Sequence, residues 1–316
     1  MDKNEPKRTP VQLVKIESDY AGQRVDNFLI TRLKGMPKTR IYRLLRKGEI
    51  RVNKKRTEQS YRLQDGDEIR LPPMVLDEKA IPKGPSRRAM SLLETRILFE
   101  DKGLLIINKP SGMPVHGGTG VNGGVVEALR AMYPALAQLE LVHRLDLATS
   151  GCLILAKKRS VLRELHGLLR EGKVHKIYWA LTKGQWKPSE YYVDAPLRKN
   201  QLNGGERMVR IDETGKPSLT EFEPLQSYND AMLVQATLHT GRTHQIRVHA
   251  RFKHHPVAGD EKYGDKEFNK KMREFGLRRM FLHSHSLEFT LPSSGQHVSV
   301  TAPLDADLQT CLDNIK

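Results

Sequence analysis

The segment Leu141-Val142-His143-Arg144-Leu145-Asp146-Leu147-Ala148-Thr149-Ser150-Gly151 is the most informative stretch of the 316-residue sequence. Asp146 lies between an arginine and a Thr-Ser-Gly turn, and the apolar run Cys152–Ala156 that follows is typical of a buried strand. On its own, this pattern favours an aspartate that caps a turn through its side chain. A second cluster of residues is needed to indicate chemistry.

That second cluster is Thr240-Gly241-Arg242-Thr243-His244-Gln245-Ile246-Arg247-Val248-His249. Taken alone, it is typical of a basic helix start that binds phosphate. An arginine next to a buried aspartate favours the charged, nucleophilic form of the carboxylate. The two clusters together therefore favour a nucleophilic Asp146 over a turn cap.

The charge of the chain points to a polyanionic partner. Lys and Arg total 53 against 37 Asp and Glu, a net charge of +16, and positions 32–56 hold 11 basic residues and one acid, Glu49. Such a local surplus binds phosphates and releases their counterions, so RNA or DNA is favoured over a merely solvated surface. A membrane surface is a weaker third choice, because no run of about 18 apolar residues exists.

Hydrophobic spacing predicts a small α+β unit near the N-terminus. Residues 1–17 form a charged tail and a lead-in strand. Helices are predicted from residue 25, with Val25, Phe28, Leu29 and Leu33 on one face, and over residues 38–47, with Gly48 as the C-cap. Arg40, Arg43 and Lys47 lie on a face of the second helix away from its apolar residues.

The rest of the chain predicts a larger α+β domain. The proline-containing stretch over residues 73–92 is read as a linker, and residues 93–316 as the larger domain. Strands are predicted near residues 97–99, 104–107, 153–156, 177–181, 232–238 and 287–291, and helices over 125–132 and 161–169. This order does not alternate regularly between strand and helix, so a mixed sheet is expected.

Two further patterns could indicate a cofactor site and a metal site, but the sequence around each argues against it. Residues 118–123 match a dinucleotide-binding fingerprint, but Pro110 and Pro114 break the strand that this mechanism requires. The histidine clusters at 249–255 and 283–285 lack an acid or cysteine at a usual ligand spacing. We expect a flexible glycine loop and core or RNA-facing histidines.

Cysteine content and the N-terminus indicate a protein of the reducing cytoplasm. Cys152 and Cys311 are far apart, which argues against a disulfide framework, and the first residues lack the apolar core of a secretory signal. Monomer is the default oligomeric state.

Several long motifs in one order resemble a known family. His143–Gly151 is similar to the signature of the ribosomal large-subunit pseudouridine synthases of the RluA type, and residues 108–116, 241–249 and 255–264 resemble that family's other motifs. Residues 18–72 resemble an S4 RNA-binding domain. In this group Leu147-Ala148 is often a charged pair, but these positions tolerate variation.

The resemblance implies an α+β fold with a mixed, largely antiparallel sheet and a small N-terminal α+β S4 domain. It implies isomerisation of uridine to pseudouridine in large-subunit (23S) ribosomal RNA, without metal or cofactor, because nothing is consumed. Asp146 matches the nucleophile, Arg247 its partner and Tyr178 the residue that stacks on the base. The candidate RNA-binding residues are Arg144, which matches the residue that fills the vacated space, and His143, Arg40, Arg43, Lys47, Arg242 and Lys109.

Three alternatives stay open at this point. The chain could be a pseudouridine synthase for another ribosomal RNA helix or for tRNA, or a non-catalytic S4 RNA-binding assembly protein. The latter has no need for Asp146 and Arg247 together. A dinucleotide-dependent oxidoreductase is disfavoured by the prolines before Gly118.

Overall fold

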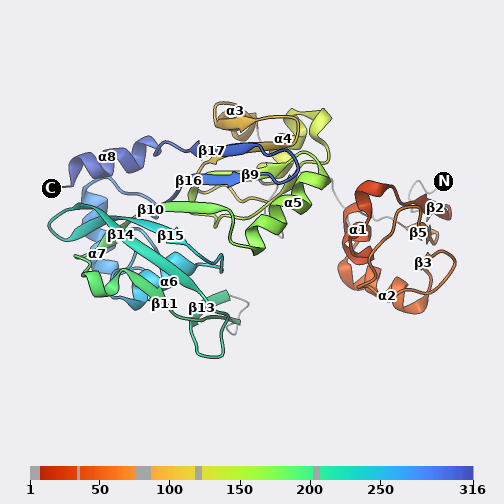
Figure 1. Ribbon diagram of the computed structural model, residues 1–316, viewed down its shortest axis with the longest axis horizontal. Coiled ribbons are helices and arrows are strands. Elements are labelled where there is room, and N and C mark those ends of the chain that lie inside the picture. Colours follow the sequence, from red (N-terminus) through yellow and green to blue (C-terminus); the bar gives the residue numbers. More distant parts are fainter. Residues whose placement is uncertain (1–7, 34–35, 76–86, 118–122, 202–206, 316) are drawn as a thin grey trace, which may run out of the picture. The chain divides into compact units, whose positions relative to one another are not determined.

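The computed structural model describes residues 8–33, 36–75, 87–117, 123–201 and 207–315. The chain divides into two compact units, residues 1–83 and 84–316, coloured red to orange and gold to blue in Figure 1. We describe each unit by itself.

The first unit packs two helices against a three-stranded sheet of order β2-β4-β3. Its elements are β1 (Arg8–Thr9), β2 (Gln12–Lys15), the 3-10 helix η1 (Ser18–Tyr20), α1 (Val25–Arg32), α2 (Lys38–Lys47), β3 (Arg51–Val52), β4 (Glu68–Leu71) and β5 (Met74–Val75). β1 pairs with β5 in a separate two-stranded sheet.

Helix α2 has the predicted bounds and the predicted apolar face. Ile41, Leu44 and Leu45 are buried in the core of this unit. Gly48 ends the helix in the left-handed region with φ +69°, and a Cβ at this position would lie 2.6 Å from Arg56 Nε. The left-handed backbone conformation favours glycine here, and a larger residue would also displace the Arg56 side chain.

The second unit is built on a ten-stranded mixed sheet. Its helices are α3 (Arg87–Glu94), α4 (Val125–Met132), η2 (Pro134–Leu136), α5 (Arg159–Arg170), η3 (Pro188–Glu190), α6 (Gln245–Phe252), α7 (Lys266–Glu274) and α8 (Ala306–Asn314). Its strands are β6 (Ile97–Glu100), β7 (Leu104–Lys109), β8 (Glu140–Leu141), β9 (Ser150–Ala156), β10 (His175–Lys183), β11 (Tyr192–Asp194), β12 (Leu197–Gln201), β13 (Arg207–Ile211), β14 (Leu219–Ser227), β15 (Ala231–Leu238), β16 (Leu282–Thr290) and β17 (His297–Thr301).

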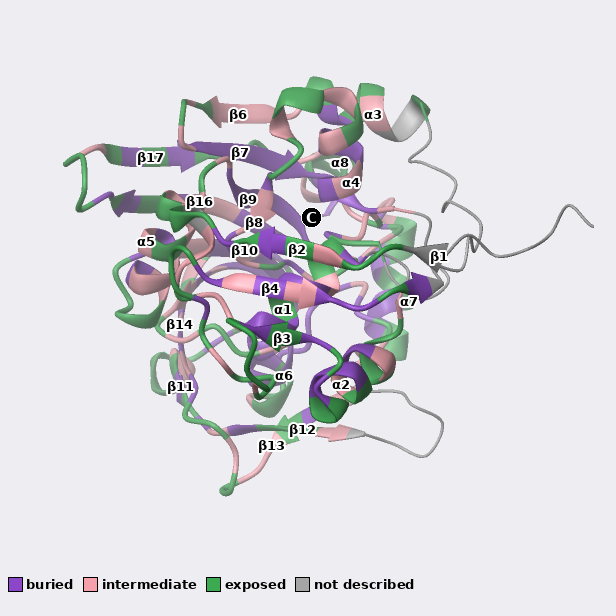
Figure 2. Cartoon of the chain, turned by 90° about the vertical axis from the view of Figure 1, so that its right-hand side faces the viewer, coloured by how far each residue is buried: buried purple, intermediate pink, exposed green. Residues whose placement is uncertain are grey.

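The large sheet has the order β11-β14-β15-β10-β16-β9-β7-β6, with β17 added to β16 and β8 to β9. Every pairing in it is antiparallel except that between β9 and β16. β7 and β9 are buried along their whole length, whereas β6 at the sheet edge is half-buried (Figure 2). Both faces of the sheet centre are therefore covered, and the predicted mixed, largely antiparallel fold is confirmed.

The predicted linker over residues 73–92 is partly wrong. β5 occupies residues 74–75, and α3 begins at Arg87 and runs past the predicted boundary to Glu94. Leu93 is fully buried and Met90 packs against the main core, so this end belongs to the second unit. Two of the four prolines that support the linker prediction, those at positions 82 and 85, lie outside the described residues.

Several other expectations concern residues that the structure only partly describes. The charged tail over residues 1–7 and most of the glycine segment 118–123 lie outside the described residues. Within the described part, no helix combines the length and apolar character needed to cross a membrane. No group of three or more His, Cys, Asp and Glu side chains among those residues could hold a metal ion.

Candidate active site

Asp146 lies in the loop between β8 and β9. A buried lysine holds this loop through hydrogen bonds to backbone carbonyl groups. Lys109, the last residue of β7, donates hydrogen bonds from Nζ to the carbonyl oxygens of Pro110, Met113 and Leu147 at 2.9, 2.9 and 3.2 Å. Three donors meet three acceptors, which is the capacity of an ammonium group. Two separate loops are thereby tied together directly beside Asp146.

The Thr-Ser-Gly turn that follows joins this loop to β9 and β16. Thr149 N–H donates to the Asp146 carbonyl at 3.1 Å, and Ser150 Oγ is 2.8 Å from His283 Nδ1. Gly151 pairs with Ser284 of the parallel strand at φ +106°, and a Cβ there would be 2.2 Å from the Ser284 carbonyl oxygen. Glycine is required for this close approach.

Arg247 is the cation that reaches Asp146. It lies in the first turn of α6 and is 8% exposed. Its Nη1 donates to Asp146 Oδ2 at 3.1 Å, and the Asp146 side chain is 21% exposed. The carboxylate is thus held from one side and open to solvent on another, as a group that meets a substrate must be.

Asp260 holds the other two nitrogens of Arg247. Nε donates to Asp260 Oδ2 at 2.7 Å and Nη2 to Oδ1 at 2.8 Å. Asp260 is 1% exposed and also accepts the backbone N–H groups of Lys262 and Tyr263. Burial disfavours its charged form, but the hydrogen bonds from Arg247 outweigh burial and lower the pKa of Asp260. A bidentate pair of this kind fixes the orientation of the guanidinium plane.

His244 approaches Asp146 from the residue just before α6. Its Nε2 is 3.6 Å from Asp146 Oδ2, and its Nδ1 is 2.8 Å from Tyr263 Oη. The backbone has φ +55°, an uncommon value for a residue with a side chain. Burial lowers the pKa of His244, against the opposing effect of Asp146.

Gln245 braces the loop that carries His244. Its Oε1 accepts hydrogen bonds from Arg242 N–H at 2.9 Å and Thr240 Oγ1 at 2.8 Å. Its Nε2 donates to the Leu219 carbonyl and to Thr220 Oγ1, both at 2.9 Å. One buried side chain thereby anchors the loop before α6 to the start of β14.

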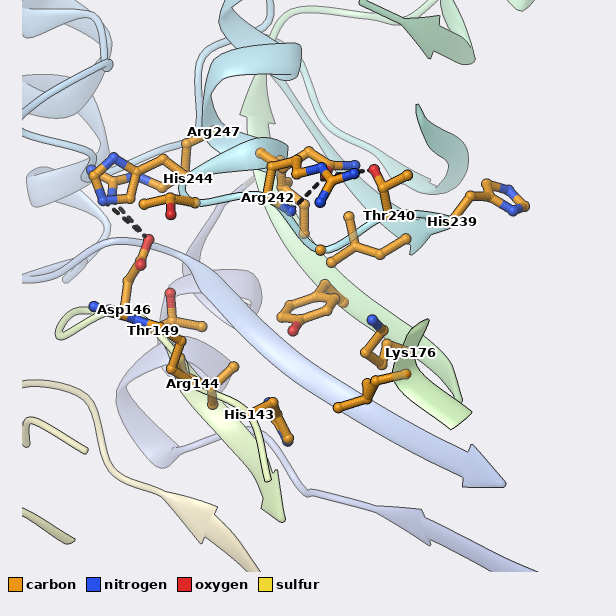
Figure 3. Close-up of a pocket in the computed structure, with 18 of the residues that line it drawn as sticks. His143, Arg144, Asp146, Thr149, Lys176, His239, Thr240, Arg242, His244 and Arg247 are labelled. Carbon is orange, nitrogen blue, oxygen red and sulfur yellow. Dashed lines mark hydrogen bonds and ion pairs between the residues drawn. The ribbon is translucent and has the colours of Figure 1, made fainter. Parts of the chain in front are cut away.

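These groups open onto one pocket of about 540 Å³ (Figure 3). Among its lining residues Asp146 is the only carboxylate, and the lysines and arginines in the lining are Arg144, Arg170, Lys176, Arg242 and Arg247. Asp146 and His244 lie on one side of the pocket, and Lys176, His239 and Thr240 lie on the other. A strongly positive pocket with a single acid suits a polyanionic substrate.

The structure brings the predicted pocket residues together. Asp146, Arg247 and Tyr178 line the pocket, as do Arg144, His143 and Arg242. Tyr178 is 7% exposed, and burial raises the pKa of its hydroxyl to about 12, so the phenol stays neutral. Burial lowers the pKa of His143 to about 3, and its Nε2 accepts the Ile154 N–H at 3.1 Å. His143 therefore adds a neutral wall to the pocket and no charge.

The expectation that Lys109 contacts RNA is wrong. Its side chain is fully buried, with 0% exposure, and its ammonium donors are used by the three carbonyls described above. Burial also lowers the pKa of Lys109 to about 7. By contrast, Arg43 and Lys47 on α2 of the first unit are exposed and Arg40 is half-buried, with no ion pair between any of them and another described residue.

The sequence did not single out four residues of this site. Asp260 and Tyr263 were seen as part of a motif without a role, and His244 and Gln245 as part of the Arg247 cluster. A buried arginine needs an acidic partner, so a search for an aspartate or glutamate close to Arg247 could have indicated Asp260. Asp260 and Tyr263 follow α6 in the chain and reach Arg247 and His244 only through the tertiary fold.

The pocket combines a single carboxylate with several cations, and comparisons with known proteins specify the class of enzyme to which it belongs. Residues 103–252 match the RNA pseudouridylate synthase family, and residues 23–69 match the S4 domain. The solved structure of human RNA pseudouridylate synthase domain containing 4 superposes with a TM-score of 0.58 at 27% identity, covering 71% of this chain and 94% of that one.

Relatives of full length make the assignment more specific. Ribosomal large subunit pseudouridine synthase C of Pasteurella multocida (strain Pm70) is 51% identical over 97% of this chain and 94% of its own. The protein of the same name from Escherichia coli (strain K12) is 50% identical over 97% of both chains. The chain belongs to the RNA pseudouridylate synthase family, so the predictions of a pseudouridine synthase, an isomerase, and of an S4 domain are confirmed.

Proposed function

We propose that this protein converts specific uridines of large-subunit (23S) ribosomal RNA to pseudouridine. The observation that carries the proposal is the single pocket carboxylate, Asp146, held by Arg247 in a chain that matches large-subunit synthases over 97% of its length. The positive pocket supports an RNA substrate. The names of the relatives support the ribosomal large subunit as its source.

We assign the chemistry to Asp146. In the isomerisation the uracil N1–C1′ bond breaks, the base turns over, a C5–C1′ bond forms, and a proton lost from C5 is matched by one gained at N1. The carboxylate assists at the ribose, either by bonding to C1′ or by assisting glycal formation. The reaction is redox-neutral and consumes nothing, which supports catalysis without a cofactor.

We assign positioning roles to the residues around Asp146. Arg247 orients the carboxylate, because its Nη1 donates a hydrogen bond to Asp146 Oδ2 at 3.1 Å. The buried ring of Tyr178 in the pocket wall provides a face for the target uracil. The target nucleotide must leave its stack to reach the pocket, and the exposed Arg144 at the pocket is suited to fill the space left behind.

We assign general RNA binding to residues 18–72 and the reaction to residues 93–316. Arg40, Arg43 and Lys47 on α2 hold RNA phosphates without reading base sequence, and the exposed Arg242 contributes at the pocket. Ribosomal RNA as substrate supports a cytoplasmic location, and we take the protein to act as a monomer.

The proposal is tested by mapping pseudouridine in RNA from cells with and without this gene. We expect discrete sites in large-subunit ribosomal RNA to revert to uridine in the deletion strain. Those sites should return when the wild-type gene is restored but not when a gene carrying Asp146→Asn is supplied. Loss of sites in tRNA only, with all ribosomal sites retained, would contradict the proposed substrate.

A further inference from the structure

Lys176 lines the pocket, and its ammonium group has no partner among the residues that the structure describes. It lies on β10 two positions before Tyr178, so both side chains project from the same face of the strand and both line the pocket. Its side chain is half-buried, yet its ammonium forms no hydrogen bond or ion pair with any residue that the structure describes. An ammonium withdrawn from water without a partner carries a free-energy cost.

The described surroundings of Lys176 supply no carboxylate partner. Burial lowers the pKa of Lys176, and no carboxylate opposes this effect. Arg170 at the end of α5 and Arg242 before α6 line the same pocket, and a Cβ on Gly241 would lie 3.7 Å from Lys176 Nζ. Asp146 lies on the opposite side of the pocket (Figure 3). Three cations that line the same pocket, with its one acid on the far side, suit an anion that arrives from outside.

The exposure of these residues indicates which anion. Arg170 and Arg242 are both exposed, so these two cations of the pocket lining are open to solvent. The backbone of an RNA chain must cross the rim of the pocket when one of its bases enters. Each of its phosphodiesters carries one negative charge that is present before any reaction begins.

We propose that Lys176, together with Arg170 and Arg242, binds a backbone phosphate of the substrate RNA adjacent to the target uridine. The proposal rests on the proposed function for the identity of the substrate. It adds a binding residue at the side of the pocket away from Asp146. The energy lost by leaving the ammonium unpaired in the free protein is recovered when the phosphate arrives.

The test compares Lys176→Met with two matched variants in the full chain. Lys176→Arg keeps the charge, and Lys183→Met removes a lysine of the same strand that pairs with Asp265 and does not line the pocket. For each protein we would measure affinity for an unmodified large-subunit RNA fragment at several salt concentrations, the single-turnover rate at saturating enzyme, and the melting temperature.

For Lys176→Met we expect binding weakened on the order of tenfold, and a plot of log affinity against log salt that is shallower by about 0.7–0.9. The rate at saturation should change less than about threefold, and the melting temperature should stay or rise because an unpaired ammonium is removed. Lys176→Arg and Lys183→Met should keep the wild-type salt slope.

Three results would overturn the proposal. An unchanged affinity and salt slope in Lys176→Met would show that the ammonium touches no phosphate. A rate loss at saturation with unchanged affinity would assign it to the uracil instead. Weaker binding accompanied by a lower melting temperature would indicate a structural role. If wild-type protein binds RNA but makes no pseudouridine while the salt slope still changes, the proposed function fails and the phosphate site stands.

Discussion

Arg247 Nη1 lies 3.1 Å from Asp146 Oδ2, although the two residues are 101 positions apart in the chain. The remaining two nitrogens of Arg247 are held by the buried Asp260. In this site one guanidinium therefore links two carboxylates. Asp260 is buried and positions the guanidinium. Asp146 faces the pocket, where we assign the reaction.

Substitutions of Arg247 distinguish the effect of its positive charge from the effect of its planar shape on the position of Asp146. Lysine keeps the charge but lacks the planar fork that contacts both carboxylates, so Arg247→Lys should lower the single-turnover rate on the order of a hundredfold, as for a reacting group misplaced by about 1 Å. Arg247→Met should be slower still, because both carboxylates lose the guanidinium that links them. RNA affinity should change far less than the rate, as measured by filter binding. Equal rates for wild type and Arg247→Met would remove this residue from the site.

Asp260 should act only through Arg247. Asp260→Asn keeps one acceptor oxygen but loses the bidentate ionic contact, and we expect the single-turnover rate to fall by about tenfold or more. On the Arg247→Met background the same change should have little further effect on the rate, since the group it positions is already gone. Additive rate losses in the double variant would show that Asp260 has a separate role.

The basic face of α2 should contribute to RNA affinity through phosphate contacts. Replacing Arg40, Arg43 and Lys47 with glutamine should make the salt dependence shallower by about 2, since each phosphate contact contributes about 0.7–0.9 to the slope. The rate at saturating enzyme should be preserved. The matched control replaces Lys266, Lys270 and Arg273, which are exposed on α7. If both triple variants change the slope equally, only net charge matters and α2 makes no specific contact.

A fall in pH should destabilise the second unit, because the buried imidazole of His283 takes up a proton less readily in the folded state than in the unfolded state. This side chain is fully buried, and burial lowers its pKa to about 4 from an ordinary value near 6.5. Above pH 6.5 the imidazole is neutral in both states. As the pH falls toward 4 only the unfolded chain takes up the proton, so stability on the order of 2–3 kcal/mol is lost.

The measurement is the free energy of unfolding at pH 7 and pH 4.5, followed by tryptophan fluorescence. Both tryptophans, Trp179 and Trp186, belong to the second unit. His283→Gln cannot titrate in this range, so its unfolding free energy should fall less between the two pH values than that of the wild type. An equal fall in both proteins would show that His283 does not titrate as proposed.

The sequence predicted the parts of this structure that local patterns control. The bounds of α2 and the cap at Gly48 follow from helical spacing and from the conformational freedom of glycine. The pairing of Asp146 with Arg247 was expected from two motifs that resemble a family. Residues whose roles depend on long-range folding were missed or misread. The prediction that Lys109 contacts RNA is one such misreading, because only the folded loops supply its three carbonyl acceptors.

The roles of Asp260 and Lys176 could not be predicted for a similar reason. Asp260 is 13 positions from Arg247, and its two contacts exist only through the tertiary fold. Lys176 is distinguished by the partner that it lacks, and a missing contact leaves no pattern in a sequence. Short strands such as β11 and β17 were also missed, because three to five residues carry little periodicity.

The central claim is that the Asp146 carboxylate carries out the isomerisation. The most direct measurement is pseudouridine formation in unmodified large-subunit ribosomal RNA under single-turnover conditions by purified wild-type protein and by Asp146→Asn, which keeps the shape and removes the charge. We expect the wild type to convert discrete uridines, and the variant to form no pseudouridine while keeping the wild-type melting temperature and RNA affinity. Appreciable pseudouridine formation by Asp146→Asn would contradict the account.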